Sequence, residues 1–323
     1  RGDAINDIEY NLDARTPNPT RMIKAYHQSA ATLNLLRAFT SSGLADLSQI
    51  KDWNEKFIEN STDAKDYNSI VKKINESVQF FETLGGHNIK DESAFKMADF
   101  FTSHEALLLD YESALTHQNI LSKKWYCCSG HFLWIGNRTR EVNEAHIEFL
   151  RGVSNPIGIK ISSSIEPDEL VEICKKINYK NEKGRLTLIS RMGADKIYDY
   201  LPNLIESIQS KGINVLWICD PMHGNTYKLK SGYKTRHFDT IVKETEAFFE
   251  IHNNLGTIPG GIHLEFTGEH VTECLGGKDN IIDNDLENHY ETACDPRLNV
   301  NQSLELAYRI TKLLIKNKEK YHV

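Results

Sequence analysis

Three residues of metal-ligand type each follow or end a short apolar stretch of the sequence. His223 follows the run VLWI, Glu265 lies within IHLEF, and Asp295 ends the stretch YETACD. Each is near the carboxyl end of a candidate strand, and the carboxyl ends of parallel strands meet at one edge of a sheet. An imidazole nitrogen with two carboxylate oxygens suits Mn²⁺ or a similar first-row divalent ion. We therefore predict a metal site at these three residues.

Basic residues follow three other apolar runs. Arg138 comes after HFLWI, Lys160 within NPIGIK, and Arg191 after RLTLIS. Three cations gathered at one edge predict an anionic substrate that carries phosphate or carboxylate. The competing interpretation is structural: such cations also pair with nearby carboxylates, and a histidine after a strand is often an ordinary packed residue.

From residue 131 onward, short apolar runs alternate with amphipathic helical patterns, which is typical of βα units and a parallel sheet. In a βα barrel the strand ends line one opening, where polar residues usually contact a ligand. The six predicted strands lie at residues 131–135, 156–161, 186–190, 214–219, 261–266 and around 292–294. The predicted helices lie at residues 140–153, 167–177, 195–210, 238–253 and 302–316.

The first part of the chain has a helical pattern instead. Asn18 and Pro19 favour a helix start, and apolar residues then recur at helical spacing until Gly43. Further helices are predicted at residues 66–84 and about 91–115, with no strand among them. We therefore predict a helical region at residues 1–125 and barrel strands carrying the site at residues 126–323.

Composition excludes several classes of protein. The 323 residues carry a net charge of −7 with 40% hydrophobic residues, which leaves room for a core but gives no basic stripe for nucleic acid. No apolar run approaches about 20 residues, so no membrane span is predicted. The six cysteines form no CxxC pair, which favours reduced thiols and a cytoplasmic location.

Eight longer strings resemble the class II, plant-type 3-deoxy-D-arabino-heptulosonate-7-phosphate (DAHP) synthases, and the resemblance spans essentially the whole chain. They are SHEALLLDYE (103–112), WIGNRTR (134–140), NPIGIK (155–160), RLTLISRMG (185–193), CDPMHGNT (219–226), KTRHFD (234–239), GGIHLEFTGEHVTECLGG (260–277) and YETACDPRLN (290–299).

The resemblance implies an α/β fold, a (β/α)8 TIM barrel of which six strands are recognisable here. It implies a transferase that condenses phosphoenolpyruvate with erythrose 4-phosphate, the first step of the shikimate pathway to aromatic amino acids. His223, Glu265 and Asp295 would then be three of the family's four metal ligands. Mn²⁺ is the expected ion, with Co²⁺ or a similar ion as the alternative.

The resemblance also implies roles for the polar residues at the strand ends. Arg138, Asn137, Lys160 and Arg191 match the positions that hold phosphoenolpyruvate. Lys160 and Arg138, together with His223, are the residues we expect to be catalytic. Residues 18–85 resemble an inserted helical pair that carries an aromatic amino acid effector site in some members, and a homo-oligomer is expected from the family.

Two departures from the family pattern stand out. Members carry roughly another hundred residues ahead of the point that matches Arg1, including two barrel strands, a metal-ligating cysteine and a KPRS-type stretch. Asn137 stands where the family's WIGERTR has glutamate. We therefore expect the chain to be a fragment of such a synthase, aggregation-prone or inactive when purified alone.

Two other functions remain open at this stage. One is a catalytically incomplete paralogue that binds phosphoenolpyruvate or an effector as a subunit, for which weak metal binding is expected. The other is a metal-dependent barrel lyase or hydrolase that acts on a different phosphorylated metabolite, for which no dependence on phosphoenolpyruvate is expected.

Overall fold

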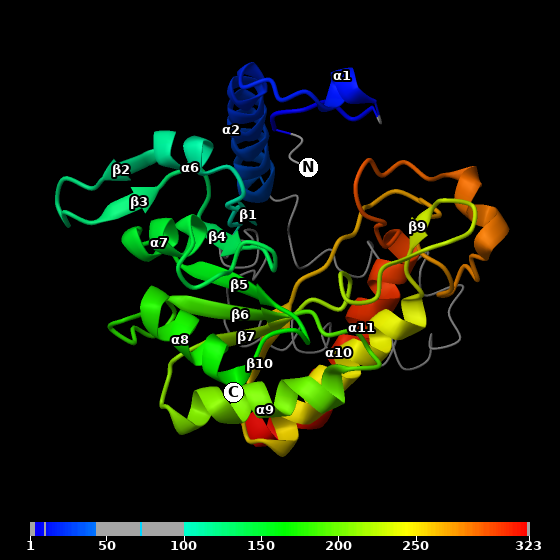
Figure 1. Cartoon of the computed structure of the whole chain (residues 1–323). Helices are drawn as coiled ribbons and strands as arrows, with labels where there is room; N and C mark the ends of the chain where they lie inside the picture. Colours follow the sequence, from blue (N-terminus) through cyan, green and yellow to red (C-terminus); the bar gives the residue numbers. More distant parts are fainter. Residues whose placement is uncertain (1–3, 10, 43–71, 73–99, 322–323) are drawn as a thin grey trace, which may run out of the picture. The chain divides into compact units, whose positions relative to one another are not determined.

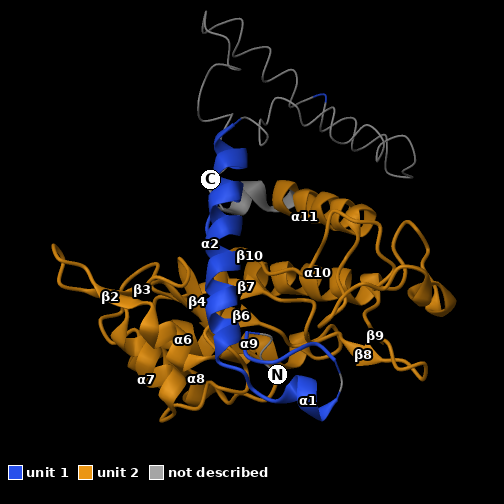
Figure 2. Cartoon of the chain, turned by 90° about the horizontal axis from the view of Figure 1, so that it is seen from above, with its two compact units in different colours: residues 1–102 blue, residues 103–323 orange. Residues whose placement is uncertain are grey.

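The computed structural model describes residues 4–9, 11–42, 72 and 100–321. The chain forms two compact units, Arg1–Thr102 and Ser103–Val323, which Figure 2 colours separately. Residues 103–125, which the sequence analysis placed in the helical region, belong to the second unit.

The first unit contains two described helices, α1 (Leu12–Arg15) and α2 (Thr20–Ser41). The Asn11 side chain accepts a hydrogen bond from the Ala14 amide and so caps α1. The helix predicted from Asn18 to Gly43 is thus confirmed as α2. The helix predicted at residues 66–84 lies, apart from Lys72, outside the described residues.

The second unit is built on one parallel sheet of six strands in the order β1-β4-β5-β6-β7-β10 (Figure 1). The strands β5 and β6 are buried along their whole length, which explains their nearly continuous apolar sequence. The strands are β1 (Ser103–Glu105), β4 (Phe132–Ile135), β5 (Ile157–Ile161), β6 (Leu186–Ser190), β7 (Leu216–Cys219) and β10 (Pro259–Ile262).

Helices follow the strands and bury one face each against them. The helix α8 shows why: its buried side chains recur every three or four residues from Leu170 to Ile177, and a proline opens its first turn. Burial of each such side chain contributes about 2 kcal/mol. The helices are α7 (Ala145–Gly152), α8 (Pro167–Ile177), α9 (Ile197–Ser210), α10 (Phe238–Asn254) and α11 (Val300–Tyr321).

The remaining described elements are short. They are α6 (Leu109–Ala114), the β2–β3 hairpin (Thr116–Gln118 and Trp125–Cys127), the β8–β9 hairpin (Tyr227–Lys228 and Lys234–Thr235) and the 3-10 helix η3 (Asp283–Asn288).

The structure corrects the helix predicted at residues 91–115. Residues 91–99 lie outside the described part, but Ser103–Glu105 forms strand β1, which pairs in parallel with β4, and helix begins only at Leu109. Pairing with a strand almost thirty residues away overrides the local helical pattern there.

The structure also corrects the strand predicted around residues 292–294. That segment instead wraps around the buried Glu273 carboxylate, which accepts hydrogen bonds from the amides of Glu291, Thr292 and Arg297. The next pairing comes at Leu298, which forms an isolated parallel bridge with Phe266 beyond the end of β10. The predicted strand at residues 261–266 likewise ends at Ile262 before that bridge.

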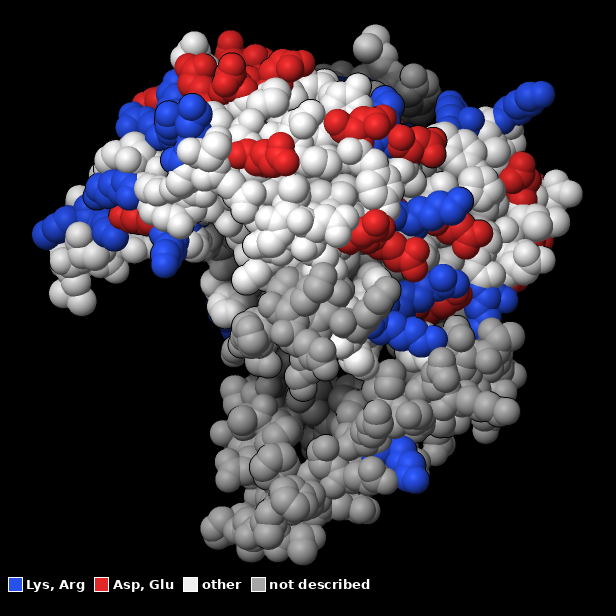
Figure 3. Space-filling model, turned by 90° about the horizontal axis from the view of Figure 1, so that it is seen from below, with Lys and Arg blue, Asp and Glu red and all other residues white. Residues whose placement is uncertain are grey.

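All six cysteines lie in the described part of the chain, and none forms a disulfide, as predicted. No helix among the described residues is long and apolar enough to cross a membrane. On the face drawn in Figure 3, lysine and arginine side chains are interspersed with aspartate and glutamate.

Candidate metal and anion site

The register of the sheet brings the ends of four strands to one edge. Ile161 pairs with Ser190, Ser190 with Cys219, and Cys219 with Ile262. The pairing continues one residue past these ends. The amides of Arg191, Asp220 and His263 each donate a hydrogen bond to the last carbonyl of the neighbouring strand, at Ile161, Ser190 and Cys219 respectively. The residues that follow the strands are therefore neighbours in space although they lie far apart in the sequence.

His223, Glu265 and Asp295 converge at this edge. One ligand atom from each lies within 4.8 Å of the other two. His223 Nε2 is 3.1 Å from Glu265 Oε1 and 4.0 Å from Asp295 Oδ2. Two carboxylates this close repel each other unless a cation lies between them. The prediction that these three residues come together is confirmed in the geometry.

Asp220 fixes the orientation of the His223 ring. The two Asp220 carboxylate oxygens lie 2.7 and 2.9 Å from His223 Nδ1 and accept a hydrogen bond from its N–H, and the amides of Met222 and His223 donate to the same carboxylate. Nε2 is then the nitrogen that faces Glu265. A histidine that donates its second ring N–H to a carboxylate is the usual arrangement at metal centres, so the donor set fits a divalent ion.

Charge and burial set the protonation of this group. Burial lowers the pKa of His223, but hydrogen bonds to Asp220 and Glu265 outweigh it and raise the pKa to about 9. Burial raises the pKa of Glu265, but His223 and the Arg236 charge lower it to about 2. The pKa of Asp220 is also held well below its ordinary value by His223 and Lys160, against the effect of burial. Glu265 thus presents an ionised carboxylate oxygen to His223 Nε2.

Two of the three predicted cations lie at the cluster. Lys160 is buried and its ammonium pairs with Asp220; burial lowers the pKa of this amine despite that charge. Arg191 donates from NH2 to the His223 carbonyl at 3.0 Å, and its buried Nε has no acceptor among the described residues. Arg138 is exposed beyond the end of β4 and, within the described part of the chain, forms no ion pair with Glu265 or Asp295.

Asn137 lies beside Arg138 at the end of β4. Its side-chain oxygen is 3.4 Å from Arg140 Nε, and Arg140 is buried and paired with Glu169. The carboxylate of Glu105 from β1 lies against the neighbouring Gly136, where a Cβ would be 2.1 Å from Glu105 Oε1. Glu105 escaped the sequence analysis because its strand was predicted as helix.

Sequence reasoning also missed two cations that bind the ligand carboxylates. Arg236 is fully buried and donates to Glu265 at 2.6 Å and to Thr226 at 2.7 Å. Lys234 is half exposed and lies 3.1 Å from Asp295. Lys234 lies in β9 of the short β8–β9 hairpin, and Arg236 directly follows it. Charged residues ordinarily face solvent there, so neither was predicted as a site residue.

His263 lies at the same edge. Its ring centroid is 6.2 Å from that of His223 and 5.2 Å from Trp134. Burial lowers its pKa to about 4, with the Lys160 charge in the same direction. His263 is therefore a neutral ring at neutral pH.

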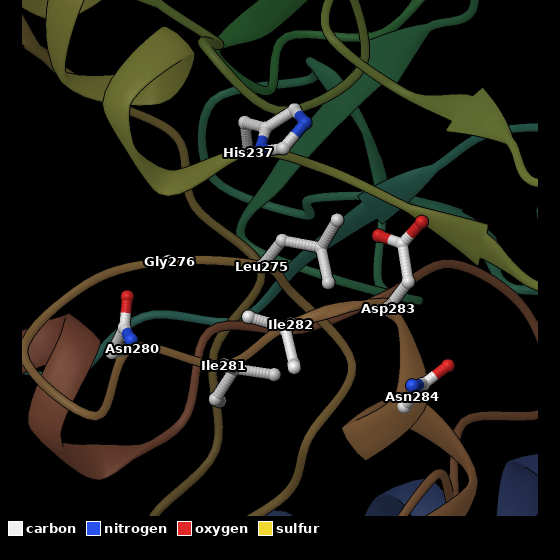
Figure 4. A pocket seen from close by; sticks show the side chains of 8 residues that line it. All are labelled: His237, Leu275, Gly276, Asn280, Ile281, Ile282, Asp283 and Asn284. Carbon is white, nitrogen blue, oxygen red and sulfur yellow. The ribbon is translucent and has the colours of Figure 1, made fainter.

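A cavity of about 380 Å³ lies elsewhere, between His237 and the segment 275–284 (Figure 4). Leu275 and Ile281 supply its buried apolar wall. The polar side chains that line it, His237, Asn280, Asp283 and Asn284, are exposed. None of the three ligand-type residues lines this cavity, which lacks the converging buried polar groups of the strand-end cluster.

Comparisons with known proteins identify the family to which the chain is similar. The family model described as "Class-II DAHP synthetase family" matches residues 1–311. A Streptomyces coelicolor protein named phospho-2-dehydro-3-deoxyheptonate aldolase is 49% identical over 313 residues, covering 97% of this chain and 69% of that protein.

A Mycolicibacterium smegmatis protein named phospho-2-dehydro-3-deoxyheptonate aldolase AroG is 47% identical over 319 residues, covering 97% of this chain and 68% of that protein. A crystal structure of 2,3-dimethylmalate lyase covers 60% of this chain and 74% of that chain at 10% identity, and its TM-score of 0.24 is too low to carry an argument.

Proposed function

The chain belongs to the class-II DAHP synthetase family, and from this membership we propose that it condenses phosphoenolpyruvate with erythrose 4-phosphate to give DAHP and phosphate. The observation that carries the proposal is the convergence of His223, Glu265 and Asp295 beside Lys160 and Arg191. A divalent metal site next to two cations suits an aldehyde and a phosphorylated carboxylate.

The proposed reaction forms one carbon–carbon bond. C3 of phosphoenolpyruvate attacks the aldehyde carbon of erythrose 4-phosphate, water adds to C2, and phosphate leaves with cleavage of its C–O bond. His223, Glu265 and Asp295 would hold the ion, which we propose to be Mn²⁺. When bound, this ion would supply Lewis-acid polarisation of the aldehyde oxygen.

The protein's own cations would bind and orient phosphoenolpyruvate. The buried Lys160 ammonium is fixed by Asp220, and Arg191 is fixed through the His223 carbonyl with its Nε still available to an anion. Fixed charges in a buried site stabilise the charge that shifts to the leaving phosphate. Arg138 and Asn137, at the end of β4, would contact the same substrate from the rim; for Arg138 this requires its exposed side chain to turn inward.

We further infer that the six-stranded sheet is part of a (β/α)8 barrel. The strands are all parallel, and the Phe266–Leu298 bridge adds a parallel pairing beyond β10. A cytoplasmic location, a homo-oligomer and an aromatic amino acid effector stay predictions; most of residues 18–85, where we expect the effector, lies outside the described residues.

Phosphate release tests the proposed activity. The chain is assayed with phosphoenolpyruvate, erythrose 4-phosphate and Mn²⁺, beside the variants His223→Ala and His117→Ala, the latter an exposed histidine on β2. We expect release that needs both substrates, is lost in His223→Ala and is retained in His117→Ala. Release without erythrose 4-phosphate, or equal release by His223→Ala, would refute the proposal. Binding of phosphoenolpyruvate without turnover would support the binding-subunit alternative.

A further inference from the structure

Glu244 is a buried carboxylate that the proposed mechanism does not use. It lies on α10, on the apolar face formed with Ile241, Thr245 and Phe248, and its exposure is 0%. An acidic residue on such a face costs free energy unless hydrogen bonds compensate for its lost hydration. Its presence there calls for a reason other than packing.

The Glu244 carboxylate joins two of the loops that build the site. Oε1 accepts hydrogen bonds from the amides of Met192 and Gly193, each at 2.9 Å, in the turn after β6. Oε2 accepts from Asn225 Nδ2 at 2.7 Å, in the loop after β7. Asn225 continues the connection, because its Oδ1 accepts from the Ala194 amide at 3.0 Å.

These two loops are also in direct backbone contact. A Cβ at Gly224 would lie 2.4 Å from the Gly193 nitrogen, and Gly193 has a φ of +90°, which side chains disfavour. One loop carries Arg191 and the other carries His223, joined by the 3.0 Å hydrogen bond from the arginine to the histidine carbonyl. The placement of the two side chains therefore depends on how the loops meet.

The polarity of the contacts favours an ionised carboxylate. All three groups that point at Glu244 are donors, so a protonated acid or an amide would turn one of its own donors toward a donor. Burial raises the pKa of Glu244 to about 7, against the opposing effect of the amides of Gly193 and Met192. The fold thus buries an ionisable group at a position where an apolar side chain of similar size would need no hydrogen bonds.

We propose that Glu244 is a positioning residue, whose ionised carboxylate ties the turn after β6 to the loop after β7 and so sets the placement of Arg191 relative to His223. What Arg191 and His223 bind rests on the proposed function. Loss of the tie would weaken both the anion and the metal side of the site at once, because each side chain belongs to one of the two loops.

The test uses the whole chain and three variants. Glu244→Gln keeps the shape and removes the charge, Glu244→Asp keeps the charge with a shorter reach, and Glu246→Gln is the matched control on the exposed face of α10. The readouts are Mn²⁺ affinity and phosphoenolpyruvate affinity by calorimetry, the KM for phosphoenolpyruvate against kcat, and far-UV circular dichroism.

For Glu244→Gln we expect the affinities for Mn²⁺ and phosphoenolpyruvate to fall about 10-fold, which is the scale of effect when a residue that supports metal ligands is changed. The KM for phosphoenolpyruvate should rise by a similar factor, and kcat at saturation should change less than about threefold. We expect Glu244→Asp to fall between Gln and wild type, and Glu246→Gln to match wild type. A purely structural role would lower the unfolding temperature and leave both affinities of the folded protein unchanged.

A folded Glu244→Gln with both affinities within about twofold of wild type would overturn the proposal. If Glu244→Gln does not fold, Glu244→Asp decides by the same criterion, and unfolding of both would assign Glu244 to folding and likewise overturn it. A wild-type chain that binds both ligands but releases no phosphate would refute the proposed function, whereas the affinities would still decide the role of Glu244.

Discussion

The described part of the second unit contains two partly buried groups in which a carboxylate meets a histidine, and they differ in how their hydrogen bonds are balanced. Under the β2–β3 hairpin, Glu112 binds His104 Nε2 at 2.7 Å, Cys127 Sγ at 3.1 Å and the Ser129 hydroxyl. Three potential donors thus surround one acceptor group. We call this group the hairpin cluster.

The group of His223, Glu265 and Asp295, which we call the strand-end cluster, has the opposite balance. One oxygen of each carboxylate faces the same imidazole nitrogen, while the other oxygen pairs with a cation, Arg236 for Glu265 and Lys234 for Asp295. Both clusters hold an acid whose pKa is lowered by its partners against the effect of burial, Glu112 in one and Glu265 in the other. The difference lies in whether the protein itself completes the set. A carboxylate whose hydrogen bonds are all supplied by protein donors stabilises the fold, whereas carboxylate oxygens that converge on one point indicate a site for a bound cation.

The largest effect that would test this comparison is expected at Asp295. In Asp295→Asn the strand-end cluster loses one negative ligand at a side chain that is about a quarter exposed. We expect Mn²⁺ binding to weaken strongly and kcat/KM for phosphate release to fall roughly 10³-fold, about 4 kcal/mol. The free energy of unfolding without metal should change by less than about 1 kcal/mol.

Calorimetry, the phosphate assay and urea unfolding measure these three quantities, with Asp168→Asn on the exposed side of α8 as the control. If Asp295→Asn kept its Mn²⁺ affinity, the carboxylates of the strand-end cluster would not form a metal site, and the two clusters would not differ in function.

The hairpin cluster should show the reverse pattern. Glu112→Gln replaces an ionised acceptor by a group with its own donor, which leaves at least one of His104, Ser129 and Cys127 without an acceptor. We expect the free energy of unfolding to fall by about 2–3 kcal/mol. Turnover per folded molecule should stay within about threefold of wild type.

Urea unfolding and the phosphate assay at a temperature well below the transition separate the two effects, with Glu172→Gln on α8 as an exposed control. Unchanged stability together with a large loss of turnover would assign the hairpin cluster to the reaction instead.

Glu244 is a third case, a carboxylate saturated by donors that carry no charge. Its pKa is raised to about 7 by burial and, secondarily, by the nearby Asp220 charge, while amides and Asn225 oppose this. A carboxyl with a folded pKa above the ordinary value of 4.5 contributes stability that is fully present below about pH 4.5 and lost as the pH rises through about 7. The ionised state used by the site is therefore the less stable one.

The difference in unfolding free energy between wild type and Glu244→Gln should accordingly depend on pH. Between pH 5 and 7 wild type should lose up to about 1.4 kcal/mol per pH unit more than the variant. Urea unfolding at three pH values measures this slope. Parallel slopes would show that Glu244 has an ordinary pKa in the fold.

Much of the fold could be predicted because its signals are local. The strand β6 and the helix α8 were predicted with the bounds that the structure shows. The unbroken apolar run of β6 reflects a strand that is buried on both faces, and the helical spacing of apolar residues in α8 reflects a helix that is buried on one face. The three residues of β1 could not be predicted, because a strand that short gains its stability from pairing with β4.

The site divides in the same way. His223 and Glu265 were predicted because each follows or lies in an apolar stretch, and parallel strands bring such ends together. Asp295 was predicted on the same ground, but the strand expected before it does not form, and the segment that carries it is held by Glu273 instead. Lys160 was predicted as a site residue, but its pairing with Asp220 was not, since the two are sixty residues apart. The pairing of Arg236 with Glu265 was not predicted either, because Arg236 follows a hairpin. Glu244 did leave a signal: it interrupts the apolar face of α10, and a charge at such a position deserves a search for donors across the fold.

The smallest expected effect concerns the two cations that flank the strand-end cluster. Arg236 is buried against Glu265, whereas Lys234 is half exposed beside Asp295. An exposed ion pair contributes at most about 1 kcal/mol and is screened by salt. Because the Lys234 ammonium competes with a metal ion for Asp295, Lys234→Gln should tighten Mn²⁺ binding by no more than about fivefold in dilute buffer. The change should be smaller in 0.5 M salt, where exposed charges are screened within roughly 5 Å.

Titration with Mn²⁺ at both salt concentrations measures this, and the direction of the change is the informative part. Tighter binding means that Lys234 balances the ligand charge only until a metal ion replaces it, which agrees with a cluster built to receive a cation. Binding that weakens as much as in Asp295→Asn would instead make Lys234 part of what holds the ligands in place. The strand-end cluster would then be closed by the protein's own charges, like the hairpin cluster.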